Sequence, residues 1–364
     1  MADPRDTANT AAVPALGGVR AEDAFDVTAV AKWLRHNAAD ATGLDEAPEV
    51  RQFSGGASNL TFLLSWPERE LILRRPPAGT KAKGAHDMAR EHDIQAALAP
   101  VYPKVVPMVG YCGDESVIGS EFYVMERLVG PILRKTIPPE LGLTAGDVTR
   151  LCDNAIDALV ELHAVDVDAA GLARLDRGPG YVHRQVEGWS RRYRAARTPD
   201  VGSLEELMSW LDRHQPDDVQ HTLIHNDFRF DNLVLGQDDP TRIVGVLDWE
   251  LATVGDPLMD LGSALAYWAQ ADDPAAIQAI RLQPTTAPGM WTREQVWAAY
   301  EQRRAIEVSE RDRRFYELFG TFRLAGIAQQ IYYRYVHGQT TNPTARGMGE
   351  VVRILDARSR ELIA

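Results

Sequence analysis

The sequence predicts an α+β protein in two parts, a small β-rich N-terminal part and a larger, mostly helical C-terminal part. Short runs of β-branched, aromatic and leucine residues, separated by turn residues, fill much of the chain between Val50 and Leu128. After Leu128, apolar residues recur mainly at helical spacing. A chain of 364 residues is also too long for one core of ordinary size. We therefore expect residues 23–127 and 128–364 to form separate lobes, preceded by a disordered tail over residues 1–22.

The elements of the first part follow from caps, strand-like runs and turns. Asp26 can cap a helix that carries Val27, Val30, Trp33 and Leu34 on one side. The turn Pro67-Glu68-Arg69 joins two runs as a hairpin. We expect strands over residues 50–53, 60–66, 70–75, 105–111 and 121–126, with a helix over residues 85–99 between the third and fourth.

The second part is predicted to be helical with one small hairpin. Thr144 can cap a long helix whose apolar residues run from Val148 to Leu162 at helical spacing. A turn at residues 236–240 separates the strands 232–235 and 242–247. Further helices are expected over residues 203–214, 257–271, 292–306, 311–337 and 344–363.

Composition limits the class of protein. The chain is 45% hydrophobic and 25% charged, as globular proteins usually are. A net charge of −13 disfavours general binding to nucleic acid or to anionic membranes. The two cysteines match no metal or redox spacing and fit a reducing cytosol. We see no signal peptide and no apolar run of the roughly 20 residues that span a bilayer, so we expect a cytoplasmic protein. The oligomeric state stays open.

The most informative stretch is His225-Asn226-Asp227-Phe228-Arg229-Phe230-Asp231-Asn232, followed by Leu247-Asp248-Trp249-Glu250. ATP-dependent phosphoryl transfer needs a group that orients the attacking hydroxyl and hard oxygen ligands for magnesium. Asp227 could hold the hydroxyl, whereas Asn232 and Asp248 could hold the metal. A lone His-x-Asp is common by chance, but the full set in this order is much more specific. The stretch therefore predicts a small-molecule kinase.

With these motifs, the chain from Val50 to its C-terminus resembles the aminoglycoside phosphotransferase and choline kinase-like family. It is most similar to the branch found alone in bacteria or fused to acyl-CoA dehydrogenases. The motifs that carry the resemblance are His-x-Asp-x4-Asn, Leu-Asp-Trp-Glu, Gly255-Asp256-Pro257 with Asp260, and Ser54-Gly55-Gly56-x-Ser58-Asn59. The resemblance implies a two-lobe, protein-kinase-like fold, with ATP or GTP and Mg²⁺ as cofactors.

The resemblance also implies roles for the residues of the motifs. Asp227 would be the catalytic carboxylate, and Asn232 and Asp248 would hold magnesium. His225 and Asp260 would support the loop structurally. Trp249 and Glu250 depart from the Phe-Gly of the protein-kinase Asp-Phe-Gly motif, as is usual in the family.

The nucleotide site is predicted from weaker signals. Gly55, Gly56 and Ser58 could cradle phosphate, although alone they would suggest only a hairpin turn. Arg74 stands where many relatives carry Lys, and its fork can pair with phosphate oxygens. Alternation places Arg75 on the strand face of Leu71 and Leu73, and Arg74 on the face of Ile72. The pattern does not decide which arginine contacts the phosphates, and we favour Arg74 by analogy.

The remaining nucleotide contacts are also predictions from the resemblance. Glu91 is the expected partner of Arg74, with Asp87 and Asp93 as rivals. The backbone of Met125, Glu126 and Arg127 would bond the adenine edge, which leaves the choice between ATP and GTP open.

The acceptor is the least determined part of the prediction. A site for polycationic aminoglycosides should be lined with Asp and Glu, but the candidate segments instead carry arginine and aromatic residues. These candidates are Trp189, Arg192, Arg323 and Arg334, and their alternative reading is a solvated or structural face. Together with the resemblance to domains fused with acyl-CoA dehydrogenases, they suggest an anionic acceptor such as a hydroxyacyl-CoA. An aminoglycoside phosphotransferase and a catalytically silent nucleotide-binding module stay open as alternatives.

Overall fold

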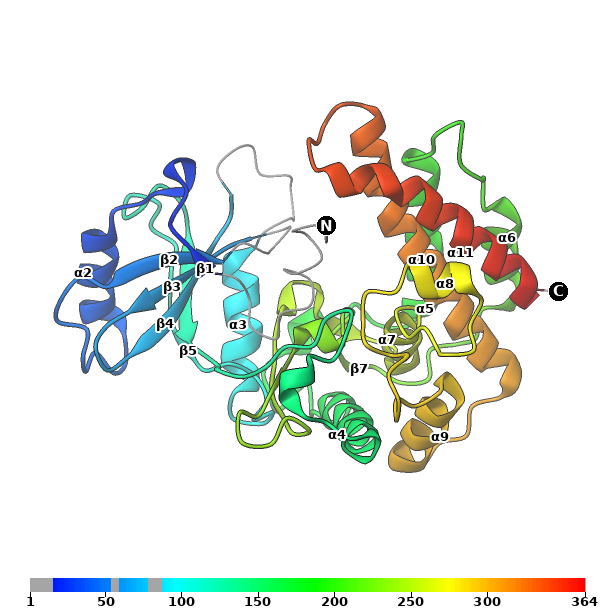
Figure 1. The fold of residues 1–364 in the computed structure, drawn as a ribbon, viewed down its shortest axis with the longest axis horizontal. Coiled ribbons are helices and arrows are strands. Elements are labelled where there is room, and N and C mark those ends of the chain that lie inside the picture. Colours follow the sequence, from blue (N-terminus) through cyan, green and yellow to red (C-terminus); the bar gives the residue numbers. More distant parts are fainter. Residues whose placement is uncertain (1–15, 54–58, 78–86, 364) are drawn as a thin grey trace. The chain divides into compact units, whose positions relative to one another are not determined.

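The computed structural model describes residues 16–53, 59–77 and 87–363 (Figure 1). Their contacts divide the chain into two compact units. The first unit contains the described residues up to Gly142 together with the later segment Phe230–Leu251. The second contains Leu143–Arg229 and the chain from Ala252 onward. Asn232 and Asp248 therefore belong to the first unit, whereas Asp227 belongs to the second.

A six-stranded antiparallel sheet forms the centre of the first unit, in the order β1-β2-β3-β4-β6-β5. The hairpin predicted around Pro67 is present, with Leu60 paired to Arg75 and Ser65 paired to Glu70. The strands are β1 (Leu16–Gly17), β2 (Glu49–Phe53), β3 (Leu60–Ser65), β4 (Glu70–Arg75), β5 (Met108–Cys112) and β6 (Phe122–Glu126).

Part of the segment expected to be a disordered tail has regular structure. Leu16 pairs with Phe53 at the edge of the sheet, and the Arg20 backbone N–H donates to Gln52 Oε1 at 3.0 Å. A short 3-10 helix follows at Ala21–Asp23. Pairing through backbone groups needs no particular side chains, which explains why the composition of this segment did not reveal it.

Each face of the sheet is covered by one helix. Helix α2 (Val27–Asn37) begins at the predicted cap, where Asp26 accepts a hydrogen bond from the Ala29 backbone N–H. Helix α3 (Met88–Leu98) begins after Asp87; residues 85 and 86 of the predicted helix lie outside the described residues. Alternating residues of the same strands contribute to two different apolar cores. One core contains Val30, Leu34, Phe62, Leu64, Leu71 and Leu73, and the other contains Leu63, Ile72, Met88 and Tyr123.

The late segment of the first unit is the predicted hairpin, formed by β8 (Leu233–Leu235) and β9 (Ile243–Val246). Two backbone hydrogen bonds join it to earlier parts of the unit, from Leu235 N to Pro131 O at 2.8 Å and from Val246 N to Lys104 O at 2.7 Å. Short 3-10 helices flank it at Phe230–Asn232 and Trp249–Leu251.

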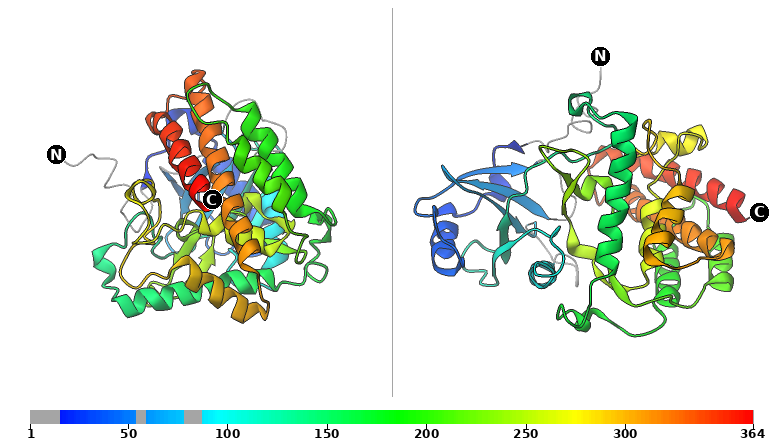
Figure 2. Two further views of the ribbon diagram at one scale, coloured as in Figure 1. Left: turned by 90° about the vertical axis from the view of Figure 1, so that its right-hand side faces the viewer. Right: turned by 90° about the horizontal axis from the view of Figure 1, so that it is seen from below.

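The second unit is mostly helical, and Figure 2 shows α11 running along α10. Thr144 caps α4 in a reciprocal capping box with Asp147. The helices are α4 (Ala145–His163), α5 (Tyr181–Ala195), α6 (Glu205–His214), α7 (Pro257–Leu265), α8 (Ala275–Ala279), α9 (Arg293–Arg304), α10 (Glu310–Val336) and α11 (Met348–Ile363). Two short antiparallel strands, β7 (Thr222–Ile224) and β10 (Thr253–Gly255), also belong to this unit.

Three differences from the sequence prediction concern the second unit. Helix α5 was not predicted, because its composition is polar and Gly188 interrupts the apolar pattern. Helix α7 ends at Leu265 rather than at residue 271, because the chain then turns where the Asp273 carboxylate accepts the Gln270 backbone N–H at 2.7 Å. Strands β7 and β10 are three residues each, too short to give an alternating pattern.

Helices α7 and α10 cross in very close contact. A Cβ added to Gly320 would lie 2.1 Å from the Gly262 carbonyl oxygen, and one added to Gly262 would lie 2.4 Å from the Tyr316 carbonyl oxygen. Only glycine permits this approach. The crossing matters for function because α7 and α10 each contribute a side chain that binds the loop after β7.

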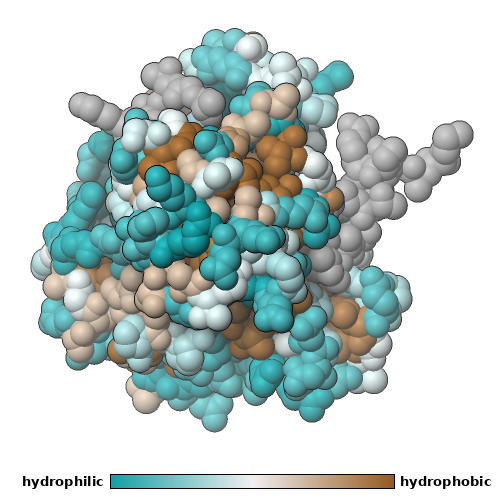
Figure 3. Space-filling model, turned by 90° about the vertical axis from the view of Figure 1, so that its left-hand side faces the viewer, coloured by the Kyte–Doolittle hydropathy of each residue, from teal (hydrophilic) through white to brown (hydrophobic). Residues whose placement is uncertain are grey.

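On the face drawn in Figure 3, hydrophobic patches lie among hydrophilic residues. None of the helices in residues 16–53, 59–77 and 87–363 combines the length and the apolar character needed to cross a membrane.

Candidate active site

Asp260, in the first turn of α7, binds the loop that follows β7. Its carboxylate accepts hydrogen bonds from the backbone N–H groups of His225 and Asn226, each at 2.7 Å. Asp260 is completely buried. Burial alone would raise the pKa of Asp260, but hydrogen bonds and charge interactions with His163 and His225 lower it below its ordinary value. The contacts expected of Asp260 as a brace are therefore present.

Asn226 has a strained backbone and is held at three points. Its φ of 64° is in the left-handed region, which asparagine tolerates better than most residues. Its N–H donates to Asp260, and its carbonyl accepts a hydrogen bond from Arg323 Nη2 at 2.7 Å. Tyr181 donates its hydroxyl to Asn226 Oδ1 at 3.3 Å. Strain of this kind persists only where neighbouring groups over-determine the conformation, and such places are often functional.

Asp227 follows Asn226 and carries the carboxylate predicted to be catalytic. Its backbone N–H donates to Nδ1 of the buried His225 at 3.2 Å, which agrees with a supporting role for that histidine. The side chain of Asp227 is 17% exposed and forms an ion pair with Arg229, with Arg229 Nε 3.0 Å from Oδ1. Arg229 was not among the residues that the sequence predicted for the site.

A buried histidine extends the support beneath this loop. His163 Nε2 lies 3.1 Å from Asp260 Oδ2, and His163 Nδ1 lies 2.7 Å from the Tyr300 hydroxyl. Both contacts are satisfied when Nε2 carries the proton and Nδ1 accepts from Tyr300. Burial lowers the pKa of His163, although the nearby Asp260 opposes that shift. A neutral imidazole and an ionised carboxylate are consistent with both directions.

We expect low pH to destabilise the folded protein, because His163 is buried in its neutral form. Its folded-state pKa lies below its ordinary value near 6.5, so the unfolded chain binds the extra proton first. The contribution of His163 to the free energy of unfolding is therefore complete above about pH 6.5. It falls as the pH drops toward the folded pKa, by at most about 1.4 kcal/mol per pH unit. Urea unfolding between pH 7.5 and 5 should show a flatter pH dependence for His163→Gln than for the wild type.

The exposed His183 of the same unit provides the control for this measurement. His183→Gln should keep the wild-type pH dependence. An unchanged pH dependence in His163→Gln would contradict the prediction.

In the first unit, the predicted ion pair between Arg74 and Glu91 is present. Arg74 Nη1 contacts Glu91 Oε1, and Arg74 Nη2 lies 3.4 Å from Asp248 Oδ1. Tyr123 donates its hydroxyl to Glu91 at 2.8 Å. Burial opposes the charge of Arg74, but Tyr123, Glu91 and Asp248 raise the pKa of its guanidinium, so it stays protonated. The rivals lie elsewhere: Asp87 caps α3, and Asp93 contacts His92.

Arg74 and Arg75 point to opposite faces of β4. Arg75 donates to the Asp23 carbonyl at 2.6 Å and lies 5.5 Å from the ring centroids of Phe25 and Phe62. Arg74 faces Glu91 on α3. Its Nε is buried and finds no hydrogen-bond partner within the described residues. An unpartnered buried donor beside an acidic cluster is a group that a phosphate oxygen could satisfy.

Asn232 and Asp248 lie on the two arms of the β8–β9 hairpin. Asn232 directly precedes β8, and its carbonyl accepts the Leu247 backbone N–H at 2.8 Å. Asp248 is the next residue, with a φ of 67° and a side chain that is 35% exposed. This backbone pairing therefore places Asn232 and Asp248 at neighbouring positions on the two arms of the hairpin. Their side-chain oxygens are hard donors that fit Mg²⁺, which usually takes one or two protein ligands together with phosphate and water.

Other metal donors do not gather in the part of the chain that the structure describes, where no three His, Cys, Asp or Glu side chains form a cluster suited to a metal. Trp249, the residue after Asp248, is fully buried, and its indole N–H donates to the Val246 carbonyl at 2.9 Å. Arg90 of α3 donates to the Glu250 carbonyl at 2.9 Å. These contacts fix the turn that carries Asp248.

The other predicted nucleotide contacts stay predictions. Gly55, Gly56 and Ser58 lie outside the described residues. Met125 and Glu126 end β6 and Arg127 follows it. The side chains of Glu126 and Arg127 form ion pairs with Arg69 and Glu70, respectively. An adenine contact through the backbone at these positions stays a prediction.

Three of the four predicted acceptor residues lie together in the second unit. The guanidinium carbons of Arg192 and Arg323 lie 4.9 and 5.5 Å from the Trp189 ring centroid. Gly326 of α10 allows Trp189 to approach, because an added Cβ would lie 3.0 Å from the indole. Arg334 is exposed near the end of α10. Within the described residues it makes no ion pair or ring contact with the other three.

The two stacked arginines carry positive charge that the described residues do not neutralise. Neither Arg192 nor Arg323 forms an ion pair with a carboxylate in that part of the chain, although Arg323 is only 6% exposed. Burial and the nearby Arg191 and Arg323 lower the pKa of Arg192. Because Arg323 also bonds the Asn226 carbonyl, this cluster, defined as Trp189, Arg192 and Arg323, adjoins the loop that carries Asp227.

The chain is similar to known proteins over most of its length. The model of the phosphotransferase enzyme family matches residues 49–312. The chain is 34% identical over 361 residues to acyl-CoA dehydrogenase family member 11 of Gallus gallus, which is 96% of this chain and 45% of that protein. The chain thus spans less than half the length of this relative.

Solved structures share the fold. A Ralstonia eutropha protein whose name places it with the aminoglycoside phosphotransferases is 32% identical, with a TM-score of 0.79 over 93% of this chain and 98% of that one. A thermostable aminoglycoside phosphotransferase in complex with AMP-PNP and hygromycin B is 17% identical, with a TM-score of 0.54 over 91% of this chain and 98% of that one. The second likeness concerns the fold alone.

Proposed function

Because the chain belongs to the phosphotransferase enzyme family, we propose that it is an ATP-dependent kinase that phosphorylates a hydroxyl group of an anionic small molecule. The observation that carries this proposal is the loop that presents Asp227. Asp260 and Arg323 hold its strained backbone from α7 and α10, and the Asp227 carboxylate stays partly exposed. A module that only binds a nucleotide has no need of such a loop.

The Asp227 carboxylate is suited to the acceptor hydroxyl. It would accept a hydrogen bond from that hydroxyl, aim its oxygen at the γ-phosphorus, and take the proton late in the transfer. The new bond joins the acceptor oxygen to phosphorus, while the bond between the γ-phosphorus and the bridging oxygen of ADP breaks. Asp227 therefore acts on the acceptor side of the reaction.

The first unit carries groups suited to the nucleotide. Arg74, fixed by Glu91, can offer its unpartnered Nε to a phosphate oxygen. Asn232 and Asp248 would hold magnesium, which when bound neutralises the charge of the phosphates. ATP and GTP are both compatible with these groups, since none of them reads the base.

The cluster of Trp189, Arg192 and Arg323 supports an anionic acceptor. Two guanidinium groups on one indole, without a carboxylate partner in the described residues, would attract a carboxylate, a phosphate or the phosphates of a CoA ester. The same charges would repel a polycationic aminoglycoside. The acyl-CoA dehydrogenase names of relatives such as the chicken protein agree with a hydroxyacyl-CoA as the acceptor.

A panel of acceptors tests the proposal directly. The full chain is incubated with ATP or GTP and Mg²⁺, and ADP or GDP release is measured with hydroxybutyryl-CoA isomers, the free hydroxy acids, kanamycin and choline. Mass spectrometry then identifies the phosphorylated product. We expect transfer to a hydroxyacyl-CoA. Transfer to kanamycin or choline alone would overturn the anionic acceptor, and magnesium-dependent nucleotide binding without any transfer would favour the silent module.

Variants of the arginine cluster sharpen this test. Arg192→Gln should raise the acceptor KM about 10-fold, since losing one charged hydrogen-bonding group costs roughly 1.5 kcal/mol. The KM for ATP should not change. Arg191→Gln is the matched control, because Arg191 is the exposed neighbour of Arg192 and pairs with Glu187. Equal effects of the two substitutions would argue against the cluster as the acceptor site.

A further inference from the structure

Arg229 contacts both oxygens of the Asp227 carboxylate. Its Nε lies 3.0 Å from Oδ1, and its Nη2 donates to Oδ2 at 3.3 Å. Both side chains are 17% exposed. A carboxylate can otherwise rotate with little restriction about its last torsion. A guanidinium that spans both oxygens limits this rotation.

Arg229 is itself held by an aromatic ring. Its guanidinium carbon lies 4.6 Å from the centroid of the Tyr267 ring, within the range of a cation–π interaction. Tyr267 belongs to the turn that follows α7, the same helix whose first turn carries Asp260. The Tyr267 backbone N–H donates to the Ala264 carbonyl at 3.1 Å, so the backbone of this turn is joined directly to the end of α7.

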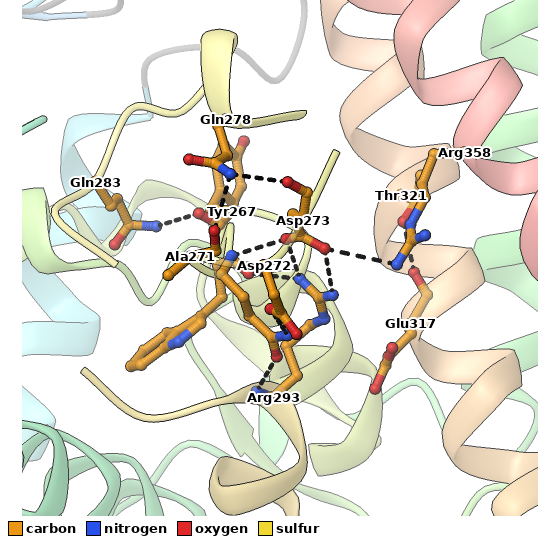
Figure 4. Close-up of polar contacts among 12 residues, drawn as sticks. Tyr267, Ala271, Asp272, Asp273, Gln278, Gln283, Arg293, Glu317, Thr321 and Arg358 are labelled. Atoms are coloured by element: carbon orange, nitrogen blue, oxygen red, sulfur yellow. Dashed lines mark hydrogen bonds and ion pairs between the residues drawn. The ribbon is translucent and has the colours of Figure 1, made fainter. Parts of the chain in front are cut away.

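The turn that carries Tyr267 is fixed by an ion-pair cluster around the buried Asp273 (Figure 4). Asp273 accepts two hydrogen bonds from Arg293, at 2.7 and 2.8 Å, and lies 3.6 Å from Arg358 of α11. Arg293 also donates to the Trp268 carbonyl at 2.9 Å, and Gln283 donates to the Tyr267 carbonyl at 3.4 Å. The turn is therefore tied to α9, to α11 and to the chain after α8.

We infer that Arg229 is a positioning residue for the Asp227 carboxylate, and that Tyr267 holds Arg229 in the orientation that this requires. The inference rests on the proposed function, because it assigns Arg229 a part in orienting the group that receives the acceptor hydroxyl. The Tyr267 ring fixes the Arg229 guanidinium, and the guanidinium fixes the Asp227 carboxylate. The orientation of the two carboxylate oxygens therefore stays constant. A misplacement of about 1 Å at a reacting group can cost roughly 100-fold in rate.

Steady-state kinetics of four variants tests this inference. With hydroxybutyryl-CoA and ATP, Arg229→Gln should lower kcat about 10- to 100-fold, with the KM for ATP unchanged. Arg229→Lys keeps the charge and should recover part of the loss. Tyr267→Leu should lower kcat in the same direction, whereas Tyr267→Phe keeps the aromatic face and should retain the wild-type kcat. Arg242→Gln, which removes an exposed arginine paired with Asp238, is the matched control.

The outcomes separate this inference from the proposed function. A wild-type kcat in Arg229→Gln, with Asp227→Asn inactive, would overturn the inference and leave the function standing. So would a raised KM for ATP at constant kcat, because Arg229 would then bind nucleotide. No transfer by the wild type to any acceptor of the panel would overturn both. If Arg229→Gln fails to fold in a thermal melt, the comparison of Tyr267→Leu with Tyr267→Phe decides, and equal kcat values in these two variants would overturn the inference.

Discussion

Asp227→Asn is expected to lower kcat by about 10³-fold while leaving the KM for ATP nearly unchanged. General-base groups contribute roughly 10² to 10⁴ in rate, and the amide keeps the size of the side chain but cannot take the hydroxyl proton. Asp227→Ala should lose at least as much, since it also loses the hydrogen bond that aims the acceptor. Release of ADP, followed at saturating ATP, Mg²⁺ and hydroxybutyryl-CoA, measures both effects.

The control for Asp227 is Asp217→Asn, which changes an exposed carboxylate ten residues earlier in the same unit. It should keep wild-type kinetics. Full activity in Asp227→Asn would contradict the proposed role of the carboxylate. A selective rise in the KM for ATP would instead place Asp227 on the nucleotide side of the reaction.

Asp260→Ala should produce the largest loss of stability among single substitutions near the loop. The substitution leaves the His225 and Asn226 N–H groups and the His163 imidazole without their buried acceptor. An unsatisfied buried group costs roughly 1–3 kcal/mol, so we expect a decrease of about 3 kcal/mol or more in the free energy of unfolding. The urea midpoint and kcat should both fall.

Asp260→Asn distinguishes support of the fold from support of the loop. The amide can still accept through its one oxygen, so we expect a smaller loss of stability, about 1–2 kcal/mol. We expect kcat to fall as well, because the second backbone N–H then faces an NH₂ group. Asp168→Asn, at an exposed site of the same unit, is the control. Wild-type stability and kcat in Asp260→Asn would contradict the role of Asp260 as a brace.

Local signals in the sequence were sufficient for much of the fold. Two strand-like runs around a short turn identified the hairpin at Pro67, and the side-chain oxygens of Asp26 and Thr144 marked helix starts. Alternation along the strand placed Arg74 and Arg75 on opposite faces, as the structure has them, but it did not decide which of the two would contact the phosphates. These features depend on neighbours in the sequence, and a single chain contains that information.

Features that depend on distant parts of the chain were not predictable in this way. Strand β1 is only two residues long, and it joins the sheet by pairing with the distant strand β2. Nothing in the local sequence indicated that Phe230–Leu251 packs with the N-terminal unit, which it does through carbonyls such as those of Lys104 and Pro131. The contact between Arg229 and Tyr267 depends on where α7 ends, and the apolar pattern had extended that helix by six residues.

Arg334 shows a limit of helical periodicity. It falls near the same face of α10 as Arg323, but eleven residues separate them, which is about 16 Å along a helix axis. Periodicity gives the direction of a side chain around the axis and says nothing about distance along it. A position nearer to Arg323 on α10, such as Gly326, contacts Trp189 directly.

The contact between Gly326 and Trp189 has a consequence for how substrate preference could diverge. A single methyl group at position 326 would press on the indole, which is only partly buried and can tilt away. The two guanidinium groups stacked on the indole would then shift with it, without any change of charge. Under the proposed function, Gly326→Ala alone would thus alter acceptor preference, while the charge of the cluster and the loop that carries Asp227 stay as they are.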